Sequence, residues 1–322
     1  MSGRMLVAVA GGFVGGLVVG GLLGWFGAGI QIPGPPVVPS GPATPAASPE
    51  PAPTPSVLDP FPTADTTGVP DGWHPAEELT GDLTVWDDGA VLEDLRLTGG
   101  TLYVRAANVT LRRVELVDAR VVNDYGRDCF NGLRIEDSSF VRADTDLGMP
   151  VIQAGGYTLA RVKMDGPSEG ARVGELALGC GPVLIEDSWL RIAPPERCVA
   201  DEVDWHGDGV QGYEGPELTV RNTAISLEQV DGCPGTAAFF YPDQGNSRAV
   251  VDRVLLSGGG YVFRLGTPGT VDGLKIVDDS WEYAPVDVLD CRRVEWGADN
   301  EIVARAQDGS LRAVEPLECA GA

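Results

Sequence analysis

The octapeptide Val109-Thr-Leu-Arg-Arg-Val-Glu-Leu116 carries a pattern that returns along the chain: alternating apolar residues, a polar or charged pair, and a closing apolar residue. The pattern is repeated at 133–140, 157–164, 183–190, 218–225 and 249–256. Apolar residues at every second position indicate β-strands that bury one face. The closing residues are spaced 19, 24, 24, 26, 35, 31 and 20 positions apart, and they are Leu97, Leu116, Phe140, Met164, Leu190, Ile225, Leu256 and Ile276.

A drifting period of this kind, with Gly, Asp and Asn turns between the units, is typical of a solenoid. One unit cannot bury its own apolar face, so neighbouring units must stack on each other. The irregular spacing favours a parallel β-helix, whose turns accept insertions, over a stricter leucine-rich horseshoe. We therefore expect an all-β parallel β-helix domain over residues 67–322.

The charge of the chain excludes one large class of partners. The 322 residues contain 47 Asp and Glu against 23 Lys and Arg, which gives a net charge of −24. Nucleic acids and anionic lipid headgroups both require a cationic surface. We therefore expect no nucleic-acid partner.

The N-terminal segment is predicted to be a membrane anchor. Residues 5–30 contain no charged residue and are long enough to span the hydrocarbon layer as a helix. Arg4 lies on the short side, so the positive-inside rule places residues 1–4 in the cytoplasm and the rest of the chain outside. A cleaved signal peptide is the alternative, with a secreted product. Small residues at four-residue steps favour self-association of the helix, although a glycine-rich export signal explains them equally well.

Residues 31–66 are rich in proline and have few residues that could form a core. This composition predicts a stiff, extended linker, which at ~3.1 Å per residue would reach up to about 90 Å from a membrane. Such a reach suits a protein that acts in or beyond a cell-wall layer.

Six cysteines behind an export segment favour disulfides over free thiols, although buried thiols remain the alternative. No two of them form a Cys-x-x-Cys pair, so a zinc cluster has little support. We expect Cys198 to pair with Cys233 in loops of neighbouring coils, and Cys291 to pair with Cys319 near the C-terminal end.

The longest insertion of the repeat lies between Leu190 and Ile225 and contains most of the candidate site residues. Equivalent positions of successive coils stack ~4.8 Å apart, so residues distant in sequence are expected to line one outward face. Aromatic rings beside carboxylates and amides suit a sugar, which needs an apolar platform and hydroxyl partners. The expected catalytic residues are Asp208, Asp243 and His206, and the expected substrate-binding residues are Gln211, Tyr213, Tyr241, Arg264 and Trp205. Asp201, Glu202 and Asp204 are candidate ligands for Ca²⁺, with no other cofactor expected.

The run His206-Gly-Asp-Gly-Val-Gln211, followed by Thr236 to Gly245 and Ser257 to Val262, resembles a group of bacterial exported proteins of the pectate-lyase-like superfamily. The openings at 81–85 and 107–111 are similar too. The resemblance covers roughly residues 67–305. It implies a right-handed single-stranded parallel β-helix with a carbohydrate-facing groove, at a bacterial cell surface. The group brings no established activity, and the Gly-His-Gly phrase of polygalacturonases is missing here.

Three functions remain open from the sequence. The first is binding of an extracellular polysaccharide by a surface-displayed module, which the anchor and linker favour. The second is polysaccharide cleavage as a lyase or glycoside hydrolase, in which Asp208 and Asp243 would act as the carboxylate pair. The third is a structural surface protein, in which His206 and Asp208 only bind turn backbone.

Overall fold

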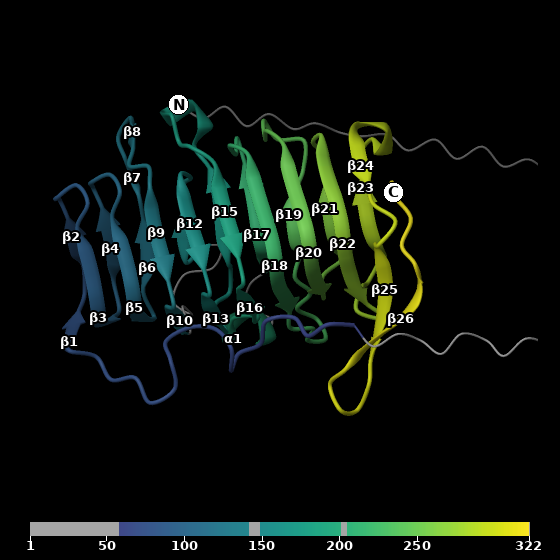
Figure 1. Ribbon diagram of the computed structural model, residues 1–322, viewed down its shortest axis with the longest axis horizontal. Helices are drawn as coiled ribbons and strands as arrows, with labels where there is room; N and C mark the ends of the chain where they lie inside the picture. Colours follow the sequence, from purple (N-terminus) through teal and green to yellow (C-terminus); the bar gives the residue numbers. More distant parts are fainter. Residues whose placement is uncertain (1–57, 142–148, 201–204, 322) are drawn as a thin grey trace, which may run out of the picture. The chain divides into compact units, whose positions relative to one another are not determined.

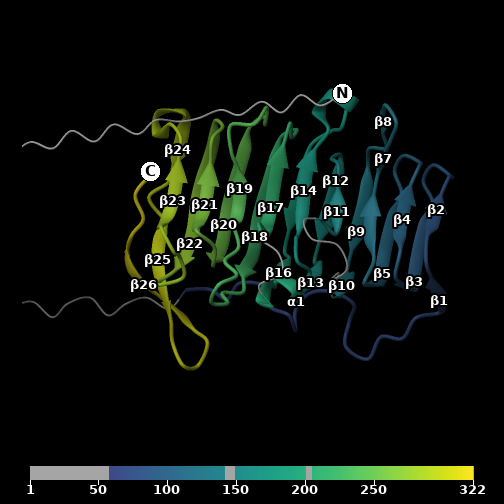
Figure 2. The same cartoon turned by 180° about the vertical axis from the view of Figure 1, so that it is seen from behind.

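The computed structural model describes residues 58–141, 149–200 and 205–321, all within one compact unit, Pro53–Ala322. These residues are nearly all β and form two long parallel sheets, as expected for an all-β solenoid (Figures 1 and 2). The expected anchor at 5–30 and most of the linker lie outside the described residues. Among the described residues, no helix is long and apolar enough to cross a membrane.

Sheet B is entirely parallel and holds one short strand from each coil. Its strands, in spatial order, are β2 (Leu83–Val85), β4 (Thr101–Val104), β6 (Arg120–Val122), β11 (Ile152–Gln153), β14 (Ala171–Gly174), β17 (Asp208–Tyr213), β19 (Ala237–Tyr241), β21 (Tyr261–Leu265) and β23 (Ala284–Val288).

Sheet A contains the repeated octapeptides, and all of its pairings are parallel except the last, β25 with β26. Its strands are β1 (Glu77–Thr80), β3 (Val91–Thr98), β5 (Thr110–Val117), β9 (Leu133–Glu136), β10 (Ser139–Val141), β12 (Tyr157–Ala160), β13 (Lys163–Asp165), β15 (Val183–Glu186), β16 (Trp189–Ile192), β18 (Leu218–Leu227), β20 (Ala249–Ser257), β22 (Gly269–Val277), β24 (Val294–Trp296), β25 (Glu301–Arg305) and β26 (Leu311–Pro316).

The predicted stacking of the closing residues is confirmed. Each one pairs in register with the closing residue of the next coil, from Leu97 beside Leu116 to Leu256 beside Ile276. All eight are at most 2% exposed, so the rows form a continuous apolar core. The core continues between the sheets, where the rings of Phe239 and Phe263 stack at 4.8 Å.

A corner in the middle of each octapeptide bends sheet A around this core. One residue per coil has a left-handed backbone there, with φ between 42° and 64°. The row contains charged and amide side chains that bond from coil to coil: Arg113 binds Asp94, Arg161 binds Asp137, and Asn222 donates to Asp187. The corner ladder is Asp94, Arg113, Asp137, Arg161, Asp187, Asn222, Arg253 and Gly273.

Residues 58–76 form a strap that runs back along the solenoid before the first strand begins (Figure 1). Leu58 donates its N–H to Leu311 at the C-terminal end, Gly68 donates to Arg161 in the middle, and the Trp73 indole donates to Asp94 in the first coil. Phe61 is only 8% exposed and packs against the Arg253 guanidinium, 4.6 Å from the ring centre. The packed part of the chain thus begins before residue 67, inside the segment expected to be linker.

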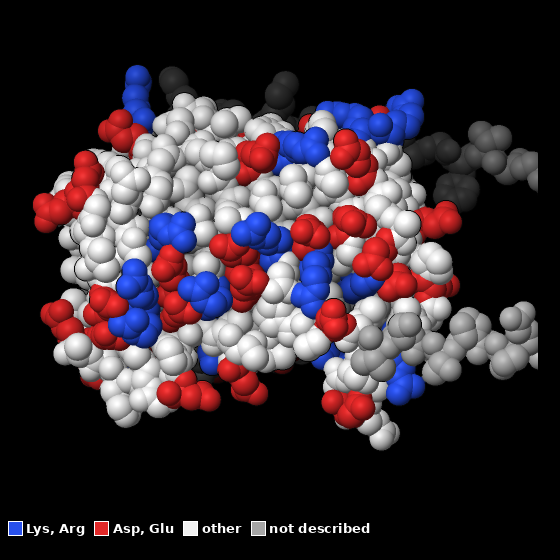
Figure 3. All heavy atoms as spheres, in the orientation of Figure 1, with Lys and Arg blue, Asp and Glu red and all other residues white. Residues whose placement is uncertain are grey.

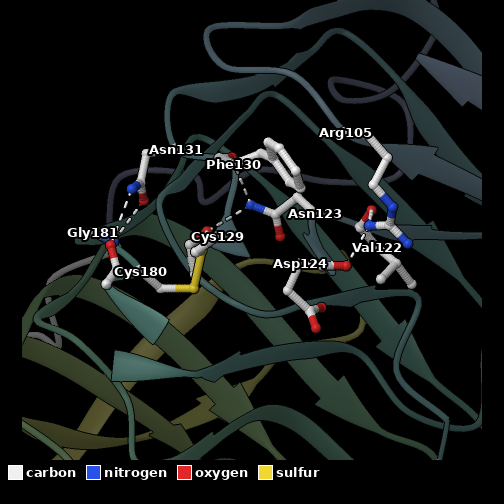
Figure 4. The surroundings of a disulfide bond; sticks show 11 residues. Arg105, Val122, Asn123, Asp124, Cys129, Phe130, Asn131, Cys180 and Gly181 are labelled. Atoms are coloured by element: carbon white, nitrogen blue, oxygen red, sulfur yellow. Dashed lines mark hydrogen bonds between the residues drawn. A yellow bond between two sulfur atoms is a disulfide. The ribbon is translucent and has the colours of Figure 1, made fainter. Parts of the chain in front are cut away.

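The described residues contain three disulfides. Cys198–Cys233 and Cys291–Cys319 are the two pairs named from the sequence, and Cys129–Cys180 is the third. Figure 4 shows the third bond beside the hairpin of β7 (Asp124–Tyr125) and β8 (Asp128–Cys129), where the Asn123 amide donates to the carbonyls of Phe130 and Gly155. The short helical elements are η1 (Leu176–Leu178), α1 (Glu196–Val199) and η2 (Cys291–Arg293).

Candidate functional site on the outer face of sheet B

One row of side chains on sheet B differs from the apolar rows on either side of it. Five neighbouring strands each contribute one residue at a matching position, and these residues are Arg172, Gln211, Phe240, Arg264 and Asp287. The adjacent row, Ala171, Val210, Phe239, Phe263 and Val286, is buried in the core. Because side chains of a strand alternate between its faces, the first row lies on the outside of the solenoid. Its members are about 4.8 Å apart along the solenoid axis.

The centre of this row is a network of four polar side chains. The Arg172 guanidinium donates to Glu169 Oε1 at 2.9 Å and to Gln211 Oε1 at 3.0 and 3.1 Å. The Gln211 amide in turn donates to Asp208 Oδ2 at 2.7 Å, and the N–H of Ala237 donates to Asp208 Oδ1 at 3.1 Å. A charge-assisted chain of this kind holds each side chain in one orientation.

The two carboxyl groups of the network are almost fully buried, with Glu169 2% and Asp208 1% exposed. Burial raises the pKa of Glu169 to about 7, against the opposing effect of Arg172. Burial and the nearby charge of Glu169 raise the pKa of Asp208 well above its usual value, although the bonds from Ala237 and Gln211 oppose the shift. A carboxyl group with a pKa near 7, such as Glu169, can hold and release a proton near neutral pH.

The His-x-Asp-Gly-x-Gln phrase has a local structural reason. Asp208 and Gln211 are bonded to each other, and Gly209 lies between them with no room for a side chain. A Cβ at Gly209 would lie 2.3 Å from the carbonyl oxygen of Ala238 and 2.3 Å from Ile225. Gly207 is similarly close to the Trp205 ring. Because Gly207 and Gly209 have no side chain, strand β17 can pack closely against its neighbours. This close packing places Asp208 at the edge of the core.

A shallow groove lies further along the same face. It has a volume of about 310 Å³ and is lined by Pro242, Asp243, Arg264, Leu265, Gly266, Asp287 and Leu289. Arg264 binds Asp287 at 2.6 Å, and its guanidinium lies 5.7 Å from the Phe240 ring and 5.3 Å from the Tyr261 ring. The groove itself is thus lined by charged and aliphatic residues, and the two rings lie against its Arg264 and outside the lining.

The expected catalytic pair is not brought together. Asp208 pairs in register with Ala237, whereas Asp243 follows Ala237 by six residues at the other end of β19. At about 3.3 Å per residue the two positions are about 20 Å apart, beyond the 5–10 Å of known carboxylate pairs. Asp243 instead lies beside Arg264 in the groove.

The expected aromatic platforms divide between the core and the surface. Tyr241 is fully buried and its hydroxyl donates to the carbonyl of Pro216, while Trp205 is 2% exposed and donates to the carbonyl of Ser168. Neither ring faces solvent as a platform. Tyr213 is 42% exposed, and its ring centre lies 6.0 Å from the Arg172 guanidinium, so it alone of the three flanks the network.

His206 is exposed and lies two residues before β17 begins. The candidate calcium ligands Asp201, Glu202 and Asp204 lie outside the described residues. Within the described ranges, no group of three or more His, Cys, Asp or Glu side chains could hold a metal ion.

Sequence reasoning missed Glu169 and Arg172. Arg172 had a signal, because the alternation Ala171-Arg-Val173 places it outward between two buried residues. Glu169 had none, since it precedes the strand in the turn Gly166-Pro-Ser-Glu-Gly170 and only the pairing of β14 with β17 brings it beside Asp208.

No family model matches this chain, and neither a curated protein nor a solved structure is similar enough to count as a match. The resemblance to pectate-lyase-like proteins therefore stays a prediction, and the site is judged by its own geometry.

Proposed function

We propose that this protein is a right-handed parallel β-helix, exported and held at a bacterial membrane by residues 5–30, that binds an extracellular polysaccharide along the outer face of sheet B. The observation that carries the proposal is the outward row Arg172, Gln211, Phe240, Arg264 and Asp287 with the groove beside it. Three disulfides among the described residues favour an oxidising compartment.

The row suits a linear polymer that runs along the solenoid axis. Arg172 and Arg264 are separated by three strand spacings, about 14 Å, so they would meet sugars at different positions of one chain. The exposed ring of Tyr213 and the half-buried ring of Tyr261 supply apolar faces near the two arginines, whereas Phe240 is only 8% exposed. Fixed arginines and amides then orient hydroxyl or carboxyl groups of the sugar.

Polysaccharide hydrolysis is the second candidate, and the buried pair Glu169 and Asp208 favours it. Hydrolysis needs one protonated carboxyl group to donate to the leaving oxygen and one carboxylate to take a proton from water. In this pair, Asp208 would hold the proton and Glu169, bound to Arg172, would carry the charge. Both groups are buried, so cleavage requires the sugar to reach them, whereas binding on the outer row does not.

A glycan array with the full-length chain tests both candidates. Arg264→Ala is expected to weaken binding to a hit by at least about tenfold, because it removes a charged partner and the packing of two rings. Arg292→Ala is the matched control, since the Arg292 side chain is 89% exposed and pairs only with Asp290. Product analysis on each hit then decides hydrolysis: release that is lost in Glu169→Gln, with binding kept, supports it. Binding unchanged in Arg264→Ala contradicts the proposed site, and no hit at all favours the structural role.

A further inference from the structure

The two ends of the solenoid are built differently. At the C-terminal end, β26 pairs antiparallel with β25 and closes sheet A. The chain after it covers sheet B, because Val288 donates its N–H to Ala320, and Cys291–Cys319 fixes this segment. A solenoid end left bare would present the unpaired edges of its last coil, and here the antiparallel strand β26 and the segment held by Cys291–Cys319 cover part of that coil.

The N-terminal end has no comparable cover among the described residues. There β2 pairs only with β4, β1 pairs only with the second half of β3, and residues 91–93 of β3 pair only with β5. Three strand edges of the first coil are thus open, and an edge strand directs half of its N–H and C=O groups away from its one neighbour. Side chains of this coil are open too: Trp86 is 71% exposed and Val91 56%, while Leu79, Leu83 and Leu92 are only partly buried.

Acidic residues outnumber basic ones at this end, where Arg96, Arg112 and Arg113 pair with Glu78, Glu93 and Asp94. Between Leu58 and Leu95 the sequence contains no Lys or Arg, whereas residues 77–94 hold seven carboxylates. Several already have partners, such as Glu78 with Arg96 and Asp94 with Arg113. The seven are Glu77, Glu78, Asp82, Asp87, Asp88, Glu93 and Asp94.

We propose that this open first coil, made of β1, β2 and residues 91–93 of β3, binds an extended β-strand of another protein whose side chains alternate between basic and apolar residues. The strand would continue the ladder of a free edge, which is a common mode of peptide recognition. Its apolar side chains would cover Trp86, Val91 and the half-buried leucines, and its basic side chains would meet the carboxylates.

Other occupants fit less well. A second copy meeting head to head would bring two acidic coils together, and like charges oppose that contact. A head-to-tail stack would meet the C-terminal end, where the antiparallel strand β26 and the segment held by Cys291–Cys319 already cover part of the last coil. The proline-rich segment before residue 58 lacks many of the N–H groups that a ladder needs.

The test uses the full-length chain and a labelled peptide of alternating Lys and Val, about six residues long. Fluorescence anisotropy should show saturable binding, and hydrogen exchange should slow at Leu79 and Leu83. The same peptide with alternate backbone nitrogens methylated should bind at least about tenfold more weakly, because it cannot complete the ladder. Glu77→Lys/Asp87→Lys should also weaken binding by about tenfold and favour a Glu-Val peptide instead.

The matched control is Asp231→Lys/Glu318→Lys, which changes net charge equally at two exposed carboxylates far from the first coil in sequence. It should bind the Lys-Val peptide like the wild type. Equal binding of the methylated peptide, or an equal loss in both charge variants, would show attraction to net charge alone and overturn the proposal. Concentration-dependent dimers that protect Leu79 and Leu83 from exchange would overturn it in favour of a second copy.

Discussion

The outer faces of the two sheets are both rich in charge, yet they are built on opposite principles. On sheet A the corner ladder repeats a left-handed residue in each coil, and most of these residues bind a neighbouring coil through their side chains. Figure 3 shows positive and negative side chains alternating in a stripe along one face of the molecule. On sheet B the outward row changes residue type at every strand, and the carboxyl groups of the adjoining network, Glu169 and Asp208, are buried rather than exposed.

The difference separates structural charge from candidate functional charge. Asp94 on sheet A has its pKa lowered to about 2 by its bonds with Arg113 and Trp73, so it stays ionised at any physiological pH. Glu169 on sheet B has its pKa raised to about 7 by burial. Asp94 stays charged and bonded to the next coil, so it holds the coils together, whereas a group that titrates near neutrality can take part in proton transfer.

The largest expected effect contrasts a glycine from each sheet. Gly209→Ala should lower the free energy of unfolding by about 4 kcal/mol or more, because its Cβ would collide with backbone and core atoms. Gly273→Asn should change it by about 1 kcal/mol or less, because seven other coils hold a non-glycine residue at the same corner position. Urea denaturation measures the free energy of unfolding of both variants. Equal losses would contradict the claim that Gly209 is tightly packed while the corner position of Gly273 accepts a side chain.

The next effect is the pH dependence of stability. The folded pKa of Glu169 is above its unfolded value, so the folded chain binds this proton more tightly. Its contribution is complete below about pH 4.5 and is lost as pH rises through about 7, a change of roughly 3 kcal/mol. Compared with Glu169→Gln/Asp208→Asn, the wild type should therefore lose stability between pH 5 and pH 8. Urea denaturation measures the free energy of unfolding of both proteins at each pH. If it changed with pH in the same way in both, the raised pKa of the buried carboxyl groups would be refuted.

The smallest effect concerns a single ion-pair partner on sheet A. Arg113→Ala should lower the urea midpoint of unfolding less than the changes above, because Arg113 pairs with Glu93 and Asp94 on a partly exposed surface where water screens the charges. Asp94 contributes stability above pH 3.8 that is lost as pH falls through about 2, so the difference from wild type should shrink in acid. Glycan binding should be unchanged in Arg113→Ala. A loss of binding would contradict the assignment of a purely structural role to the charges on sheet A.

The sequence by itself determined the stacked strands, the register of the closing residues and two disulfide pairs. It could do so because period-two alternation fixes which side chains face the core, and a repeated pattern fixes which of them become neighbours. The alternation Ala171-Arg-Val173 already places Arg172 on the outside.

Only the tertiary structure decided the composition of the site. Glu169 and Asp208 meet because β14 pairs with β17 across the insertion, and no local pattern specifies that pairing. The run Ala237–Tyr241 is apolar or aromatic at every position, so its sequence offers no alternation to show that Tyr241 points inward. The strap and the contrast between the ends also depend on contacts between distant segments, which a local pattern does not encode. The alternation of residues in a strand determines which side chains point outward, but the packing of one coil on another determines which of those side chains meet.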